Sequence, residues 1–295
     1  MKMSNRNITI ISLFDGISCG REAIRRITSS SNIRYFASEI NQNAITVSKS
    51  NFPDIIQLGD IRTLSYAKEV LTNSQTKESF NVGNVFLLLA GSPCQGFSKQ
   101  GSQSTFMHNE SRLYAYFLKL LKAIKPKYVL LENVVMPSHC EDKISKELSH
   151  VMPTIRLIKL NSKDWSAQNR ERLYWTNIPV ARFVYPGSHP RTMRQLVGPN
   201  YAGIYARPHG YFKGGFFKDR LKSHCVVKTA YLASFFKIMK DGSRITFTPE
   251  EIELLQTLPK GYTRMVPGKH SRVELIGNGW TVALIQDILR NVIPP

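Results

Sequence analysis

The chain has 295 residues, of which 42% are hydrophobic and 21% are charged. This composition excludes a largely disordered chain and is typical of a packed globular protein. The net charge is +19, which favours a polyanionic partner.

The first 180 residues alternate between strand-like and helix-like segments. Strands are predicted over residues 8–14, 33–40, 54–60, 85–90 and 128–133, and helices over 19–27, 41–51 and 110–124. The runs 85–90 and 128–133 are almost entirely apolar, which is typical of strands buried on both faces. Strands that alternate with helices predict an α/β fold with a doubly wound, mostly parallel sheet.

The first predicted strand is followed by the glycine-containing turn "LFDGISCG". Such a turn lets a ligand approach the backbone and presents helix N–H groups to it. Asp15, Glu39 and Asp60 stand at the ends of three successive predicted strands. Glu39 follows Gly16 by 23 residues, a separation at which a carboxylate is suited to accept hydrogen bonds from ribose hydroxyls. Asp60 is similarly suited to an adenine amine. The three acids favour a nucleoside-containing cofactor over the alternative, a tight turn with surface acids.

Cys94 follows the predicted strand 85–90 in the stretch "GSPCQGFSKQGS". A single cysteine is most often a small buried hydrophobe. Gly91 and Pro93 leave this loop few ways to bury a side chain, and Lys99 supplies positive potential that favours a thiolate. From these residues alone, a packing role and a nucleophilic role remain about equally supported.

Glu132 ends the apolar strand 128–133, where an acid is unfavourable unless it is paired or functional. One alternative is a structural pair with a neighbouring arginine, and the other is an acid in catalysis. The segment "SAQNRERLYWTN" then offers Gln168, Arg170 and Arg172. Alternate residues of a strand point to one side, so the two arginines are expected to face one anion or carbonyl.

Residues 181–243 differ in character. They contain eleven lysines and arginines, two acids and eleven phenylalanines and tyrosines. Helices are predicted again over 248–258, with Thr248 as N-cap and Pro249 at the first helical position, and over 281–293. We therefore expect a catalytic cofactor-binding domain over 1–180, a small basic domain over 181–243, and a return to the first domain over 244–295.

The four cysteines, at 19, 94, 140 and 225, form no CxxC pair and have no accompanying His-x-x-x-His spacing, so no metal site is predicted. They also do not suggest a disulfide scaffold, and a reducing compartment is expected. We predict neither a signal peptide nor a span of the roughly 18–20 apolar residues that crosses a bilayer. The expected location is the cytoplasm of a bacterium or phage-infected cell, or the nucleus in a eukaryote.

Taken in order, "FDGISCG", "SE", "GD", "GSPCQGFS", "ENV", "QNRER" and "LIGNGW" resemble the motifs of DNA (cytosine-5)-methyltransferases. The resemblance covers the chain except residues 181–243, where that family has its target-recognition domain. "SLFDGIS", "YFASEI" and "ENVVMP" are similar to the animal de novo type, although many bacterial and phage enzymes share the scheme, restriction–modification enzymes among them. Two departures are the few glycines of "GISCG" and the short recognition segment of 63 residues.

The resemblance implies transfer of a methyl group from S-adenosylmethionine to C5 of cytosine, leaving S-adenosylhomocysteine, on a Rossmann-like methyltransferase fold. Cys94 would attack C6 of a flipped-out cytosine, and Glu132 would hold N3 and the exocyclic amine. Arg172 would contact O2, with Arg170 and Gln168 shaping the site. The implied cofactor contacts are Phe14, Asp15, Gly16, Ile17, Glu39, Ile40, Asp60, Ile61, Pro93, Asn278, Gly279 and Trp280.

The implied partner is double-stranded DNA, bound by a monomer or weak homo-oligomer with no membrane. The expected DNA contacts are Gln95, Ser98, Lys99, Gln168, Arg207, Lys213, Lys218 and Arg220. One alternative keeps the chemistry and changes the substrate to tRNA, because one branch of the family methylates RNA. A second alternative is a non-catalytic DNA-binding regulator, which the presence of Cys94, Glu132, Arg170 and Arg172 disfavours.

Overall fold

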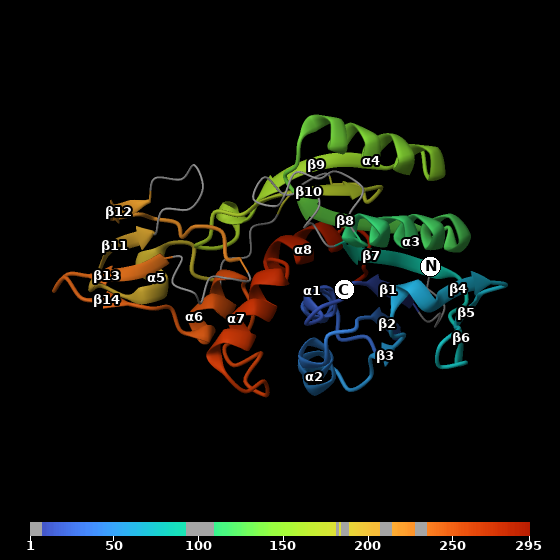
Figure 1. Ribbon diagram of the computed structural model, residues 1–295, viewed down its shortest axis with the longest axis horizontal. Coiled ribbons are helices and arrows are strands. Elements are labelled where there is room, and N and C mark those ends of the chain that lie inside the picture. Colours follow the sequence, from blue (N-terminus) through green and yellow to red (C-terminus); the bar gives the residue numbers. More distant parts are fainter. Residues whose placement is uncertain (1–7, 93–108, 181–182, 184–188, 207–213, 228–234) are drawn as a thin grey trace.

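The computed structural model describes all residues except 1–7, 93–108, 181–182, 184–188, 207–213 and 228–234. Within the described residues, the chain forms an elongated molecule with a large mixed sheet at its centre and a small sheet at one end (Figure 1). The two sheets are joined by the chain segments around α6 (Pro249–Leu255) and α7 (Lys269–Asn278).

The central sheet has seven strands in the order β3-β2-β1-β7-β8-β10-β9. Their bounds are β1 Ile8–Leu13, β2 Ile33–Ser38, β3 Ile56–Gln57, β7 Val85–Gly91, β8 Tyr128–Val134, β9 Arg156–Asn161 and β10 Glu171–Thr176. The first five in this order are parallel, and β10 runs antiparallel to both of its neighbours. The order reverses between β1 and β7, where parallel α/β sheets form ligand crevices at the carboxyl ends of their strands. The predicted α/β fold with a mostly parallel sheet is confirmed.

Helices cover both faces of this sheet. Helices α1 (Cys19–Arg25), α2 (Gln42–Asn51) and α8 (Val282–Leu289) share one apolar core, and α3 (Asn109–Ile124) and α4 (Ser138–Val151) share the other. Alternate residues of β1 divide between the two, since Ile10 belongs to the first core and Ile11 to the second. This two-sided burial explains the apolar runs in the sequence.

Three predicted elements differ from their observed bounds by more than two residues at one end. The predicted strand over 54–60 is only two residues long, because Asp60 caps a 3-10 turn over Ile61–Thr63 through a hydrogen bond from the Arg62 amide. The predicted helix over 281–293 ends at Leu289. The helix predicted over 248–258 spans Pro249–Leu255, and the Thr248 cap is confirmed as part of a capping box with Glu251.

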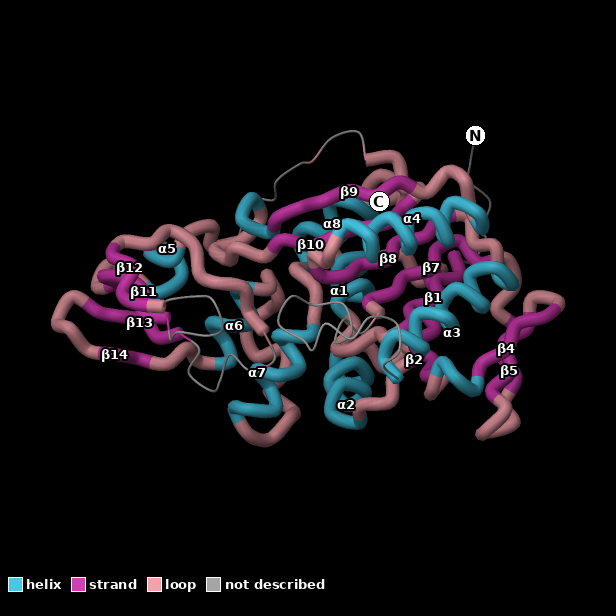
Figure 2. Tube along the Cα trace, turned by 45° about the horizontal axis from the view of Figure 1, so that its top comes forward, coloured by secondary structure: helices cyan, strands magenta, loops and turns pink. Residues whose placement is uncertain are grey.

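A three-stranded antiparallel sheet was not predicted. It consists of β4 (Leu64–Ala67), β5 (Val70–Asn73) and β6 (Ser79–Asn81) and lies at the opposite end of the molecule from the small four-stranded sheet (Figure 2). The turn between β4 and β5 is Lys68-Glu69, both with positive φ of 49° and 62°. Such turns usually contain Asn-Gly or Asp-Gly, so this hairpin has no sequence signal.

The small sheet has the order β12-β11-β13-β14, with antiparallel neighbours throughout. Its strands are β11 Tyr201–Ala206, β12 Gly215–Lys218, β13 Phe235–Met239 and β14 Arg244–Ile245, preceded by α5 (Met193–Val197). Lys237 of β13 donates from Nζ to both carboxylate oxygens of Glu251, at 2.6 and 2.8 Å. Both side chains are largely buried, so this ion pair fixes the small sheet to α6.

Candidate active site

The turn after β1 and the end of β2 are joined by hydrogen bonds to one carboxylate. Oε2 of Glu39 accepts from the Gly16 amide at 2.8 Å, and Oε1 accepts from the Ile40 and Asn41 amides at 2.7 and 2.8 Å. Gly16 has φ of +60°, and Phe14 and Ser18 also have positive φ. The turn is therefore held in a conformation that L-residues rarely adopt, next to an oriented acid.

Asp15 lies beside this turn and is also hydrogen-bonded. Its Oδ1 accepts from the Tyr35 hydroxyl at 2.8 Å, and its Oδ2 accepts from the Ser18 hydroxyl. Burial raises the pKa of Asp15 to about 6, although the hydrogen bonds from Ser18 and Tyr35 oppose that shift. A carboxyl with such a pKa changes charge near neutral pH.

The surroundings of the turn fit a nucleoside-containing ligand. A Cβ built on Gly16 would have no atom within 4 Å, so there is open space above the turn. Ile40 is 63% exposed, which leaves an apolar side chain free to cover a ring. Asp60 follows β3, which pairs with β2, and the Arg62 guanidinium, which donates to it, lowers the pKa of its carboxyl. Ile61, also predicted to contact the cofactor, is buried.

Residues near the C-terminus complete this region. Trp280 lies against Gly91, where a built Cβ would come within 3.0 Å of the indole Nε1. Gly279 follows α7 as its C-cap, and a Cβ there would come within 3.0 Å of the Cys19 Sγ and 3.6 Å of Ile17. Asn278 is exposed at the last position of α7. The structure thus brings residues 278–280 to the glycine turn and to the end of β7.

Glu132 and Arg172 form an ion pair at the carboxyl end of β8. The Arg172 Nε lies 3.1 Å from the Glu132 Oε1, and the two side chains are 13% and 10% exposed. Glu132 faces Tyr174 of β10 across the sheet and pairs with Gly91 of β7 on its other side. Of the two alternatives for Glu132, the arginine pair is present, and its partner is itself a residue predicted to act in catalysis.

Gln168 and Arg170 are buried and engaged with the protein. Gln168 is 0% exposed; its Nε2 donates to the Leu255 carbonyl and its Oε1 accepts from the Val226 amide. This placement does not fit the predicted contact of Gln168 with DNA, because the amide would have to leave a fully satisfied buried position.

Arg170 is 5% exposed and donates to the carbonyls of Val226, Gly277 and Gly279 at 2.7, 3.3 and 3.0 Å. Its guanidinium is thereby used to hold the 277–279 turn in place. This arrangement fits a residue that shapes the site, as the family resemblance implied, better than one that faces an anion or carbonyl of a ligand.

Several predicted site residues lie outside the described residues: Pro93, Cys94, Gln95, Ser98, Lys99, Arg207 and Lys213. Lys218 is exposed on β12. The Arg220 guanidinium stacks over the Phe217 ring at 4.9 Å and its Nε donates to the Lys222 carbonyl, so it is partly engaged within the small domain.

Sequence reasoning missed Cys225, which lies at this site, and Lys222, which lies three residues before it. The Cys225 Sγ lies 3.5 Å from the Arg172 Nη2 and 3.6 Å from the Arg170 Nη1. The Lys222 ammonium donates to the carbonyls of Lys163, Ser166 and Arg191 and so links the segment after β12 to the segments before β10 and α5. Neither residue belongs to a local motif, and more than fifty positions separate Cys225 from either arginine.

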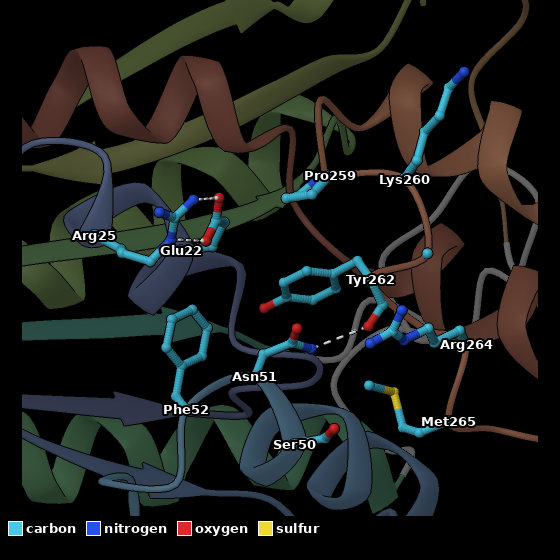
Figure 3. Close-up of a pocket in the computed structure, with 11 residues that line it drawn as sticks. Glu22, Arg25, Ser50, Asn51, Phe52, Pro259, Lys260, Tyr262, Arg264 and Met265 are labelled. Atoms are coloured by element: carbon cyan, nitrogen blue, oxygen red, sulfur yellow. Dashed lines mark hydrogen bonds and ion pairs between the residues drawn. The ribbon is translucent and has the colours of Figure 1, made fainter.

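A cavity of about 320 Å³ lies at the C-terminal ends of α1 and α2 (Figure 3). It is lined by side chains from these helices and from the loop after α6, among them Glu22, Arg25, Asn51, Phe52, Lys260, Tyr262 and Arg264. The Tyr262 hydroxyl donates to the Ile17 carbonyl at 2.9 Å, and its carbonyl accepts from Asn51. The predicted cofactor residues Phe14 to Ile17, Glu39 and Ile40 precede the N-terminal ends of the same helices, and none of these residues lines the cavity.

The described residues contain no group of three or more histidines, cysteines, aspartates or glutamates that could hold a metal ion. In the same part of the chain, every helix is too short or too polar to cross a membrane.

Comparison with known proteins identifies a family. Residues 8–195 match the family model described as C-5 cytosine-specific DNA methylase. The chain is 31% identical over 187 residues to the type II methyltransferase M.NlaIV of Neisseria lactamica, which covers 58% of this chain and 41% of that protein. The chain thus spans less than half the length of this curated relative.

Solved structures share the fold over nearly the whole chain. The Entamoeba histolytica methyltransferase EhMeth superimposes with a TM-score of 0.70 and 17% identity, covering 97% of this chain and 98% of that one. A variant of Spodoptera frugiperda DNMT2 gives a TM-score of 0.66, also at 17% identity, over 96% and 99% of the two chains.

Proposed function

Because the chain belongs to the C-5 cytosine-specific DNA methylase family, we propose that it transfers a methyl group to C5 of cytosine in double-stranded DNA. The observation that supports this most strongly is the Glu132–Arg172 ion pair at the carboxyl end of β8. Glu132 pairs in the sheet with Gly91, three residues before Cys94, so the chain leads from this pair directly to the expected nucleophile.

The proposed reaction begins with addition of the Cys94 thiolate to C6 of the base, which forms an S–C6 bond and makes C5 nucleophilic. Glu132 binds the N3 edge and protonates N3 as the adduct forms, and Arg172 hydrogen-bonds O2. After C5 is methylated, solvent takes the C5 proton, N3 returns its proton to Glu132, and elimination of Cys94 restores the C5–C6 double bond and the free thiolate. A base inside a duplex cannot reach these groups, so it must flip out at a cost of a few kcal/mol.

The residues around the glycine turn fit S-adenosylmethionine, which supplies an electrophilic methyl group when bound. Glu39 would hold the ribose hydroxyls, and Asp60 with the amide of Ile61 would hold the adenine, which the exposed Ile40 would cover. Asp15, beside the turn, would face the positive charge of the ligand. Phe14, Ile17 and the 278–280 turn would close the remaining sides.

We assign DNA recognition to the small sheet, within the domain predicted over 181–243. Its exposed Lys218, together with Arg220 and the lysines and arginines outside the described residues, would contact phosphates. These contacts would offset the cost of flipping the base, and Ser98 and Lys99 would add to them. The catalytic domain is then formed by residues 1–180 and 244–295.

Cofactor affinity is expected to rise as the pH increases through about 6. The pKa of Asp15 is raised by burial to about 6, so below this pH the carboxyl is neutral and attracts a cationic ligand less. In Asp15→Asn, we expect the affinity at pH 8 to fall several-fold. The rise in affinity near pH 6 should also be absent from this variant. Calorimetric titration with S-adenosylmethionine across the range measures both effects.

Asp54→Asn provides a matched control, since Asp54 is an exposed acid of the same domain that pairs with Arg21. Without ligand, the raised pKa also has a stability consequence: the folded protein binds more protons than the unfolded chain between pH 3.8 and about 6. Asp15 therefore makes stability fall as the pH rises through this window, and Asp15→Asn should lack that component. An unchanged affinity profile in Asp15→Asn would place Asp15 outside the cofactor site.

Methyl transfer is tested with labelled S-adenosylmethionine and either duplex DNA or tRNA, followed by bisulfite sequencing of the DNA. We expect label at C5 of cytosine in DNA. Label in tRNA alone would show that the substrate is tRNA and not DNA. Transfer to neither nucleic acid, with intact cofactor binding, would indicate a non-catalytic regulator.

A further inference from the structure

The segment containing Cys225 is held firmly against the central domain by its backbone. The Ser223 amide donates to the Ala167 carbonyl at 2.7 Å, and the Asn169 amide donates to the Ser223 carbonyl at 3.0 Å. One residue beyond Cys225, the Val226 amide donates to Gln168. The Cα of Cys225 is therefore fixed opposite residues 168–172, although it follows β12 of the small sheet in the chain.

The sulfur of Cys225 lies between two arginines of the candidate active site. It accepts from the Arg170 Nη1 at 3.6 Å and from the Arg172 Nη2 at 3.5 Å. The Arg170 guanidinium also donates to uncharged backbone carbonyls, and Glu132 is ion-paired with Arg172. Among these described groups one positive charge is in excess, and an ionised Cys225 would balance it.

The three described cysteines differ in ionisation. Burial raises the pKa of Cys19 to about 12 and also raises the pKa of Cys140. Burial acts in the same direction on Cys225, but the guanidinium groups of Arg170 and Arg172 outweigh it and lower the pKa of this thiol. The direction agrees with the geometry of a sulfur that accepts from two cations.

We propose that Cys225 is a positioning residue of the methyl-transfer site, whose thiolate holds the Arg172 guanidinium against Glu132 and links the recognition domain to the catalytic carboxylate. This inference rests on the proposed function, which supplies the role of Glu132. In the chain Cys225–Arg172–Glu132, the sulfur fixes one nitrogen of the guanidinium and the carboxylate fixes another. A recognition domain bound to DNA is thereby coupled through one sulfur to the residues that hold the base.

The test compares the steady-state kinetics of Cys225→Ala and Cys225→Ser with wild type, using duplex DNA. We expect kcat of Cys225→Ala to fall about tenfold, the scale of one lost hydrogen bond to a charged group, with KM for the cofactor unchanged. Serine accepts a hydrogen bond but carries no charge. The ratio of wild-type to Cys225→Ser kcat should therefore increase with pH as the thiolate forms. Cys140→Ala, which removes a buried thiol of α4, is the control and should match wild type.

If Cys225 had only a structural role, the ratio of wild-type kcat to Cys225→Ser kcat would not change with pH. That result, or an unchanged kcat in Cys225→Ala, would overturn the proposal. Alkylation of Cys225 by iodoacetamide, followed by peptide mass spectrometry, gives a readout that needs no activity. The rate of alkylation should rise with pH, with its midpoint below the pH expected for a free thiol. In Arg172→Met this midpoint should move to higher pH. A wild-type protein that methylates nothing would refute the proposed function, whereas active wild type with a pH-independent ratio would refute only the role of Cys225.

Discussion

Replacing Cys94 with alanine is expected to abolish methyl transfer while cofactor binding persists. The reaction needs a thiolate that adds to C6, and removal of a covalent nucleophile lowers kcat by roughly four orders of magnitude or more. The described cysteines offer no substitute. Burial raises the pKa of Cys19 and Cys140, and the sulfur of Cys225 is engaged by two arginines.

The measurement is incorporation of a labelled methyl group into duplex DNA, with cofactor affinity determined in parallel. Cys140→Ala serves as the matched control. A duplex carrying 5-fluorocytosine adds an independent readout, because the C5 fluorine cannot leave as a proton does and elimination is blocked. Wild type should remain covalently attached to this duplex, and Cys94→Ala should not. A Cys94→Ala protein with the wild-type rate would refute the nucleophile assignment.

Glu132→Gln is expected to lower kcat by about two to four orders of magnitude, the contribution of a positioned general acid. Glutamine keeps the size of the side chain but cannot donate a carboxyl proton to N3. It also removes the negative partner of Arg172, which is 13% exposed and lies 3.1 Å away. The loss should therefore appear in kcat, with the KM for the cofactor little changed because Glu39, Asp15 and the glycine turn are intact.

Glu171→Gln is the matched control for this variant. Glu171 is adjacent to Arg172 on β10 but is 48% exposed and pairs only at 3.4 Å with Lys159. Exposed pairs of this kind contribute little, so activity and the denaturation midpoint should stay near wild type. A cooperative unfolding transition of Glu132→Gln shows that this variant is folded in the assay. Equal activity of Glu132→Gln and Glu171→Gln would show that Glu132 does not take part in the reaction.

Much of the central domain could be predicted because its signals are local. The apolar runs at 85–90 and 128–133 are buried strands, and Thr248 forms the expected cap. Asp15 and Glu39 were predicted at the ends of two successive strands, and parallel strands bring their carboxyl ends to one edge of the sheet. Gly16 and Glu39 are indeed joined by a hydrogen bond.

The remainder depends on contacts between distant segments, which local patterns do not encode. Arg170 and Gln168 were expected to face the substrate, but their donors are used by carbonyls near residues 226, 255 and 277–279. The hairpin at Lys68-Glu69 was missed because neither residue is a typical one for positive φ.

The contact between Trp280 and Gly91 has a consequence for how the molecule acquires its site. It joins positions nearly two hundred residues apart, and the Tyr262–Ile17 hydrogen bond spans 245. Closing such long loops costs chain entropy before any contact compensates for it, so these steps come late in folding. During synthesis, strands β1, β2, β7 and β8 can leave the ribosome and pair long before residue 280 is translated. The glycine turn after β1 would then remain uncovered until the last part of the chain is synthesised. The ability to bind the cofactor would therefore be acquired after the sheet has folded, as a separate event.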